Sequence, residues 1–139
     1  MGVRCEDIER LTYRNEVFDV FITQDVLEHV WNPDQACREI MRVLCPGGFH
    51  IFTTPKHKDI TSTIRRAEFK DGQVVHLYEP QYHGSPIGDG KCLVTWDFGT
   101  DFDDHLREWT GYPVSTFVIR DRSLGIDGEF LDVFVMRKT

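Results

Sequence analysis

The residues best suited to chemistry lie in one short segment, Gln24 to His29, which is rich in polar and ionisable groups. His29 is the candidate catalytic base of this segment, because an imidazole gains and loses a proton near neutral pH. A base of this kind helps a reaction whose acceptor must lose a proton. The competing interpretation is a structural histidine that bonds a nearby backbone group in the turn after a strand. The residue type alone leaves both interpretations open.

A metal site is a second kind of chemistry for which the sequence contains suitable residues. His76 and His83, with Asp97 or Asp101, offer the imidazole and carboxylate groups that zinc accepts. Their spacing matches no known zinc-binding pattern, and six histidines in 139 residues make chance pairs common. The four cysteines stand far apart and form no Cys-x-x-Cys pair. The sequence therefore predicts no metal site, and reduced thiols as in a cytoplasmic protein.

The overall charge narrows the range of partners. With 23 acidic against 16 basic residues, the formal net charge is −7, which opposes binding to a phosphate backbone. No apolar stretch approaches the roughly 18 residues that a membrane-spanning helix needs. Residues 1–10 lack the apolar centre of a secretory signal. The sequence therefore predicts no nucleic-acid partner, no membrane partner and a cytoplasmic location.

A strand precedes the segment Gln24 to His29, and a helix and a second strand follow it. Residues 17–22 are apolar apart from Asp19, which is typical of a strand in a parallel sheet that is covered on both faces. Residues 49–53 are expected to form the second strand. Strand, helix and strand at this spacing predict a right-handed βαβ unit.

The helix of this unit carries signals at both of its ends. Asn32 is expected to cap it, with Pro33 at the favoured first position and Gln35 completing an approximate capping box. Pro46-Gly47-Gly48 is expected to end it, because proline cannot continue a helix and glycine tolerates a left-handed exit.

Beyond Pro55 the pattern changes to shorter elements. Asp71-Gly72 is a strong signal for a hairpin turn, and Asp101 is expected to cap a helix with one apolar face. The predicted elements are a hairpin of residues 64–69 and 74–78, a loop over 79–90, a strand over 92–98, a helix from 102 that ends at Gly111, and closing strands over 116–120 and 130–137.

Four motifs follow one another in order over residues 5–55. They are Glu6-Asp7-Ile8-Glu9, Phe18-Asp19-Val20, Leu27-Glu28-His29 and Arg42-Val43-Leu44-Cys45-Pro46-Gly47-Gly48. In this order and spacing they resemble the class I S-adenosylmethionine-dependent methyltransferases of the broad type 11 kind. The resemblance implies S-adenosylmethionine as the cofactor and methyl transfer to an acceptor that the sequence does not identify.

The resemblance also implies a single α/β domain over residues 1–139, with a partial Rossmann-like methyltransferase sheet. Its parts are a βαβ core over 1–55, an insertion that contains a β-hairpin over 56–100, and a helix with an antiparallel terminal strand pair over 101–139. Two motifs of the insertion receive no role from the resemblance. They are Tyr82-His83-Gly84-Ser85-Pro86 and Trp96-Asp97-Phe98-Gly99.

Individual residues receive roles from the same resemblance. Asp7 and Ile8 are expected to contact the adenine side of the cofactor. Gln24, Asp25 and Val26 are expected to contact its methionine side or the substrate, and His29 is the candidate base. The competing interpretation is that Asp7 and Asp25 only belong to solvated turns. Transfer of a methyl group from a sulfonium is an in-line displacement, so the enzyme mainly supplies proximity and orientation.

Two family features are expected to be missing from this chain. In the family, a Gly-x-Gly loop lies after the first strand and a ribose-binding carboxylate after the second, and neither precedes Phe18. We therefore expect a truncated methyltransferase with an open edge on the strand Phe18–Ile22. A second copy, a partner chain or a strand of the insertion is expected to cover this edge. The alternative function is a non-catalytic remnant that acts as an interaction or oligomerisation module.

Overall fold

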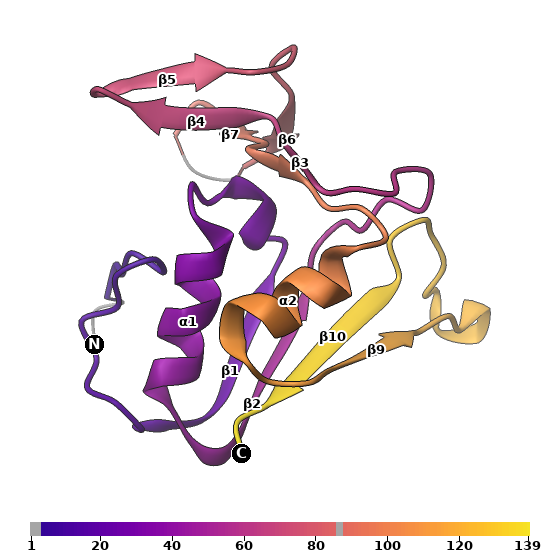
Figure 1. Cartoon of the computed structure of the whole chain (residues 1–139). Coiled ribbons are helices and arrows are strands. Elements are labelled where there is room, and N and C mark those ends of the chain that lie inside the picture. The colour runs from indigo at the N-terminus through magenta and orange to yellow at the C-terminus, as the bar shows by residue number, and fades with distance from the viewer. Residues whose placement is uncertain (1–3, 86–87) are drawn as a thin grey trace.

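The computed structural model describes residues 4–85 and 88–139, which are built around a four-stranded sheet. In spatial order the strands are β1 (Phe18–Gln24), β2 (Leu44–Thr53), β10 (Asp132–Arg137) and β9 (Val114–Val118). β1 and β2 are parallel neighbours, whereas β10 runs antiparallel to both β2 and β9. Figure 1 shows this arrangement, which confirms the predicted α/β class with an antiparallel terminal pair.

The helix between β1 and β2, α1 (Pro33–Val43), begins at the predicted proline. The predicted capping role of Asn32 is wrong, because its side chain makes no bond to the helix. Its Nδ2 instead donates to Oε2 of Glu9 at 2.8 Å. Glu9 competes successfully for this amide because its other oxygen also accepts from the backbone N–H groups of Trp31 and Asn32, at 2.7 and 3.1 Å.

The strand β2 begins at Leu44, earlier than the predicted start at residue 49. The two glycines predicted as a helix stop therefore lie inside the strand, where the register against β1 shifts. Gly47 has a φ of +84°, and a Cβ on Gly48 would lie 2.9 Å from the backbone oxygen of Asp19. Glycine is needed here because β2 bulges while it stays close to its neighbour.

The hairpin of the insertion confirms the turn signal in the sequence. β4 (Ala67–Lys70) pairs with β5 (Gln73–His76) in antiparallel register. Asp71 and Gly72 between them have φ values of +51° and +78°. Positive φ at both central residues is what a two-residue type I′ hairpin turn requires.

A second short hairpin corrects the loop predicted over 79–90. β6 (Tyr82–Gly84) pairs with β7 (Lys91–Leu93) in that part of the chain. Residues 86–87 of the predicted loop lie outside the described residues. Three-residue strands carry too little periodicity to be recognised in a sequence, and they form here because a partner strand is available.

The predicted strand over 92–98 is divided into β7 and β8 (Trp96–Asp97), and β8 pairs with β3 (Ile64–Arg65). Thr95 explains the break, because its Oγ1 donates to the backbone oxygens of Glu28 and Val30 at 2.9 and 2.7 Å. The backbone N–H of Thr95 also donates to the backbone oxygen of Glu28 at 2.8 Å. The insertion is thereby attached to the turn that follows β1.

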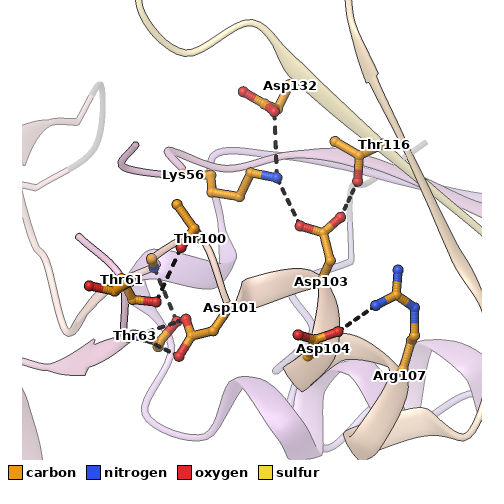
Figure 2. Close-up of polar contacts among 11 residues, drawn as sticks. Lys56, Thr61, Thr63, Thr100, Asp101, Asp103, Asp104, Arg107, Thr116 and Asp132 are labelled. Carbon is orange, nitrogen blue, oxygen red and sulfur yellow. Dashed lines mark hydrogen bonds and ion pairs between the residues drawn. The ribbon is translucent and has the colours of Figure 1, made fainter. Parts of the chain in front are cut away.

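The second helix, α2 (Phe102–Thr110), confirms the element predicted after Asp101 and ends at Gly111, whose φ is +74°. The Asp101 side chain does not cap this helix. It accepts from the backbone N–H and the Oγ1 of Thr63 at 2.8 and 2.7 Å instead (Figure 2). Neither helix of the described residues is long and apolar enough to cross a membrane.

A polar cluster around Lys56 joins the start of the insertion to α2, β9 and β10 (Figure 2). The Lys56 Nζ lies 2.8 Å from Oδ2 of Asp103 and 3.6 Å from Oδ1 of Asp132. The Thr116 hydroxyl donates to the other oxygen of Asp103. Burial would raise the pKa of Asp103, but the hydrogen bonds from Lys56 and Thr116 outweigh burial and hold that pKa below its usual value.

The two faces of the sheet differ in their cover. Both α1 and α2 pack on one face (Figure 1). The core between helices and sheet includes Ala36, Ile40, Phe52, Phe102, Leu106, Phe134 and Met136. Apolar side chains stay exposed elsewhere on the sheet, including Val20, Ile22, Phe49 and Phe117.

β1 lies at an edge of the sheet, as predicted. The idea that a strand of the insertion covers this edge is wrong for the described part of the chain, because those strands pair with one another. Cover by a second copy or by a partner chain stays a prediction.

Candidate functional site

A cavity of about 370 Å³ lies beyond the carboxyl ends of β1 and β2. Its lining residues are Asp25, Glu28, His29, Pro55, His83, Gly84 and Phe130. Ligands of open α/β sheets bind beyond the carboxyl ends of the strands, and sites for small molecules commonly have volumes of about 300–1,000 Å³. This cavity is therefore the candidate functional site.

The ends of the two parallel strands are held together at the floor of the cavity. Asp25, directly after β1, has a φ of +50°, a left-handed conformation that aspartate tolerates better than most residues. Its backbone N–H donates to the Thr53 oxygen at 3.0 Å, and Thr53 Oγ1 donates to Asp25 Oδ1 at 3.2 Å. This turn leads into a short 3₁₀ helix, η1 (Leu27–His29), which carries two of the lining side chains.

Glu28 is buried at the inner side of the cavity, with 1% of the residue exposed. Its Oε2 accepts from Thr54 Oγ1 at 2.8 Å, whereas its Oε1 has no hydrogen-bond partner among the described residues. Burial raises the pKa of Glu28, even though the Thr54 bond and the neighbouring His29 act in the opposite direction. A buried carboxylate oxygen without a partner is costly, so this atom is suited to meet a ligand.

The hydrogen bond of His29 determines which ring nitrogen is available. Its Nδ1 lies 2.8 Å from the backbone oxygen of Leu93. A carbonyl only accepts, so the neutral ring carries its proton on Nδ1 and a lone pair on Nε2. That Nε2 lies 3.7 Å from Oε1 of Glu28. The structural and the catalytic interpretations of His29 are therefore compatible. Its Nδ1 bonds the backbone, and its Nε2 is available to act as a base.

His83 reaches the same atoms from the insertion. It belongs to β6, and its Nδ1 lies 3.8 Å from Oε1 of Glu28. Its ring meets the His29 ring edge to face, with 5.0 Å between centroids. Two imidazoles and one carboxylate from distant parts of the sequence thus converge on a single point.

The structure brings only part of the predicted site together. Asp25 and His29 line the cavity. Gln24 is exposed on β1, and Val26 packs against the hydrophobic core. Ile8 also packs against this core, and Asp7 accepts from the backbone N–H of Glu9 at 3.0 Å in a local turn. Neither Asp7 nor Ile8 is among the described residues that line the cavity.

The cavity also contains two residues, Glu28 and His83, that the sequence did not assign to this site. Glu28 stands in the motif Leu27-Glu28-His29, and His83 in the insertion motif that received no role. Both motifs were visible, but nothing local in the sequence links them. The other residues considered as metal ligands are directed elsewhere: Asp97 binds Arg66 at 2.5 Å, and Asp101 binds Thr63.

A second, apolar hollow adjoins the cavity. It has a volume of about 300 Å³ and shares Phe130 with the first. Its other lining residues are Thr53, Ile119, Ile126, Leu131 and Val133. Phe130 therefore lies between an acidic hollow and an apolar one.

Comparison with known proteins relates part of the chain to a known domain family. Residues 1–52 match the family described as a methyltransferase domain, and no curated protein matches the chain. The chain has a class I methyltransferase-like fold. Solved structures extend the likeness of this methyltransferase-like chain beyond residue 52. An S-adenosylmethionine-dependent methyltransferase from Mesorhizobium loti has a TM-score of 0.58 and 15% identity, and the match covers 95% of this chain and 67% of that one.

Two further structures show how the same fold serves different reactions. SpnF, a [4+2]-cyclase, has a TM-score of 0.54 and 17% identity, with 97% of this chain and 54% of that chain covered. An N1-methyltransferase from Burkholderia thailandensis, solved with S-adenosylhomocysteine, has a TM-score of 0.52 and 15% identity. The match covers 95% of this chain and 48% of that chain. The methyltransferase-like chain spans about half the length of these two proteins. At such identities the likeness concerns the fold, which does not determine the reaction.

Proposed function

We propose that this chain takes part in S-adenosylmethionine-dependent methyl transfer, and that the cavity beyond β1 and β2 holds the reacting groups. The observation that carries the proposal is a cavity with two carboxylates, Asp25 and Glu28, at the carboxyl ends of parallel strands. The fold and the match over residues 1–52 support the same reaction class.

The residues present suit the charge of the cofactor. When bound, S-adenosylmethionine supplies a methyl group on a positively charged sulfonium. Asp25 and the unpartnered oxygen of Glu28 favour a cation in this cavity, because opposite charges attract, most strongly at the buried Glu28. Gln24 and Val26 flank Asp25 in sequence, so they extend the proposed methionine-side contact. Asp7 and Ile8 remain proposed adenine-side contacts on the resemblance alone.

His29 is the proposed base of the reaction. Its Nδ1 proton is held by Leu93, so the neutral ring offers the Nε2 lone pair to an acceptor that must lose a proton. The adjoining apolar hollow, behind Phe130, is suited to the apolar part of such an acceptor. All four cysteines are free thiols, which agrees with the proposed location in the reducing cytoplasm.

Calorimetric titration of the purified chain with S-adenosylhomocysteine tests this function. We expect binding that Asp25→Asn weakens at least fivefold. Asp104→Asn is the matched control, because it removes the same charge from the exposed side of α2. No heat of binding at about 1 mM ligand, which corresponds to about −4 kcal/mol, would rule out cofactor binding by this chain.

The open edge of the sheet favours a second candidate function, an interaction or oligomerisation module. Ile22 on β1 is 70% exposed, and Val20 on the same face is also exposed. A sheet edge with apolar side chains is a ready pairing surface, and a second copy of this chain related by a two-fold axis satisfies both strands at once.

Light scattering distinguishes this module from a monomer. We expect a dimer that Ile22→Lys dissociates, whereas Leu124→Lys, at an equally exposed apolar residue of η2 (Arg122–Leu124), leaves the mass unchanged. A monomeric mass for the unaltered chain over the whole concentration range would contradict pairing through β1.

A further inference from the structure

We infer that Glu28, His29 and His83 form a binding site for a divalent transition metal ion, with zinc as the best match, at the inner end of the cavity. The inference goes beyond the proposed methyl transfer and does not depend on it. It also revises the sequence prediction of no metal site. His83 was considered there with other possible ligands, whereas the structure places it beside Glu28 and His29.

The distances among the three side chains are those of a site ready to close on an ion. The Oε1 of Glu28 lies 3.7 Å from His29 Nε2 and 3.8 Å from His83 Nδ1. One ligand atom of each residue lies within 4.8 Å of the others. Tetrahedral zinc with bonds of about 2.0–2.1 Å separates its ligand atoms by about 3.4 Å. Both separations from Glu28 Oε1 are within a few tenths of an ångström of this spacing, and the two histidine nitrogens approach each other by up to about 1.4 Å to complete the site.

Two of the three ligands are already oriented by other groups. His29 donates its Nδ1 proton to the backbone oxygen of Leu93, which directs the lone pair of Nε2 toward Glu28. Glu28 accepts from Thr54 through Oε2, which leaves Oε1 directed to the histidines. Metal-binding histidines and carboxylates in proteins are usually held in this way by a second set of hydrogen bonds.

The unpartnered oxygen is the independent observation that points to a ligand. Glu28 is almost completely buried, yet its Oε1 has no hydrogen bond among the described residues. No lysine or arginine is among the described residues that line the cavity, whereas Asp25 adds a second carboxylate. A cation bound between Oε1 and the two imidazoles would satisfy the buried oxygen and balance the local negative charge.

The donor set indicates the class of metal. Two imidazoles with one carboxylate suit zinc and similar first-row ions, whereas calcium and magnesium prefer oxygen ligands alone. Three protein ligands leave one position open toward the cavity, as in catalytic rather than structural zinc sites. A bound metal would use the Nε2 lone pair of His29 and Oε1 of Glu28, so the roles proposed above for these two atoms in methyl transfer apply to the metal-free chain.

Calorimetric titration of chelator-treated protein with zinc chloride, in the absence of any nucleoside, tests the site. We expect one zinc per chain and a higher midpoint of thermal unfolding with zinc, because the metal binds the folded state. Cobalt chloride is the spectroscopic probe, and it is expected to give visible absorption bands of four-coordinate nitrogen and oxygen ligation.

Variants identify the ligands. His83→Gln and His29→Gln are each expected to weaken zinc binding at least tenfold, since loss of a supporting hydrogen bond alone commonly costs 10–100-fold. His76→Gln, on the exposed strand β5, is the matched control and should bind zinc like the unaltered chain. His83 is partly exposed on a short strand outside the core, so its variant keeps the fold, which circular dichroism checks.

Three results would overturn the inference: no zinc bound by the unaltered chain, binding that is unchanged in both His83→Gln and His29→Gln, or binding that His76→Gln reduces equally. Because no cofactor is present, these outcomes are separate from those of the S-adenosylhomocysteine titration.

Discussion

Two polar centres of this protein bury carboxylates in opposite ways. Asp103 has Lys56 Nζ at 2.8 Å and the Thr116 hydroxyl on its other oxygen, and these bonds lower its pKa. Glu28 has one hydroxyl, from Thr54, on one oxygen and no hydrogen bond to the other among the described residues, and burial raises its pKa. The first centre contains a lysine, whereas no lysine or arginine is among the described residues that line the second.

This difference separates a structural centre from a binding centre. The Lys56 cluster joins the insertion, α2 and the two terminal strands, so its charges stabilise the arrangement of those elements (Figure 2). The Glu28 cluster opens into a cavity and lacks compensation, so a cation from outside can improve it. A buried charge without a partner is therefore more informative about function than a well-paired one.

Removal of Lys56 should have the largest effect on stability. Lys56→Met leaves Asp103 and Asp132 largely buried without their cation, so we expect a loss of about 3 kcal/mol in the free energy of unfolding. Urea denaturation measures it. A loss below about 0.5 kcal/mol would mean that this centre does not hold the elements together.

The acid side of the stability profile should depend on Asp103. Its pKa is lowered by folding, so its contribution is complete above the unfolded value of about 3.9 and is lost as pH falls through the lower folded value. We expect Asp103→Asn to cost about 1 kcal/mol at pH 7, a modest figure because solvent reaches part of the pair.

Urea denaturation of both proteins at several pH values checks this prediction. The difference in stability between the unaltered chain and Asp103→Asn should stay constant near neutral pH and shrink below about pH 4. A difference that grows on acidification would contradict the assigned sign.

The smallest effect on stability is expected at Glu28. In Glu28→Gln the amide oxygen still accepts from Thr54, while the uncompensated carboxylate disappears. We therefore expect stability within about 0.5 kcal/mol of the unaltered chain, or slightly higher, together with loss of zinc binding. A loss of about 1 kcal/mol or more by urea denaturation, as expected for Asp103→Asn, would mean that Glu28 stabilises the fold as Asp103 does.

Much of the fold was predictable because its signals are local. The βαβ unit, the Asp71-Gly72 turn and the stop at Gly111 each depend on residues within a few positions of one another. The errors arose where a residue distant in sequence formed the hydrogen bond that decided the local structure. Glu9 takes the Asn32 side chain, and Thr95 interrupts a strand by bonding the turn after β1.

The candidate site likewise has a part that local sequence predicts and a part that depends on distant contacts. The sequence by itself determined that a polar turn with Asp25 and His29 follows an apolar strand, because apolar runs and turn residues act on their own neighbourhood. Only the tertiary structure decided that Glu28 faces inward and that His83 lies 3.8 Å from it. That meeting depends on the β6–β7 pairing and on the bonds of Thr95 to Glu28 and Val30, and those bonds join residues more than sixty positions apart. No local pattern encodes a contact at that range.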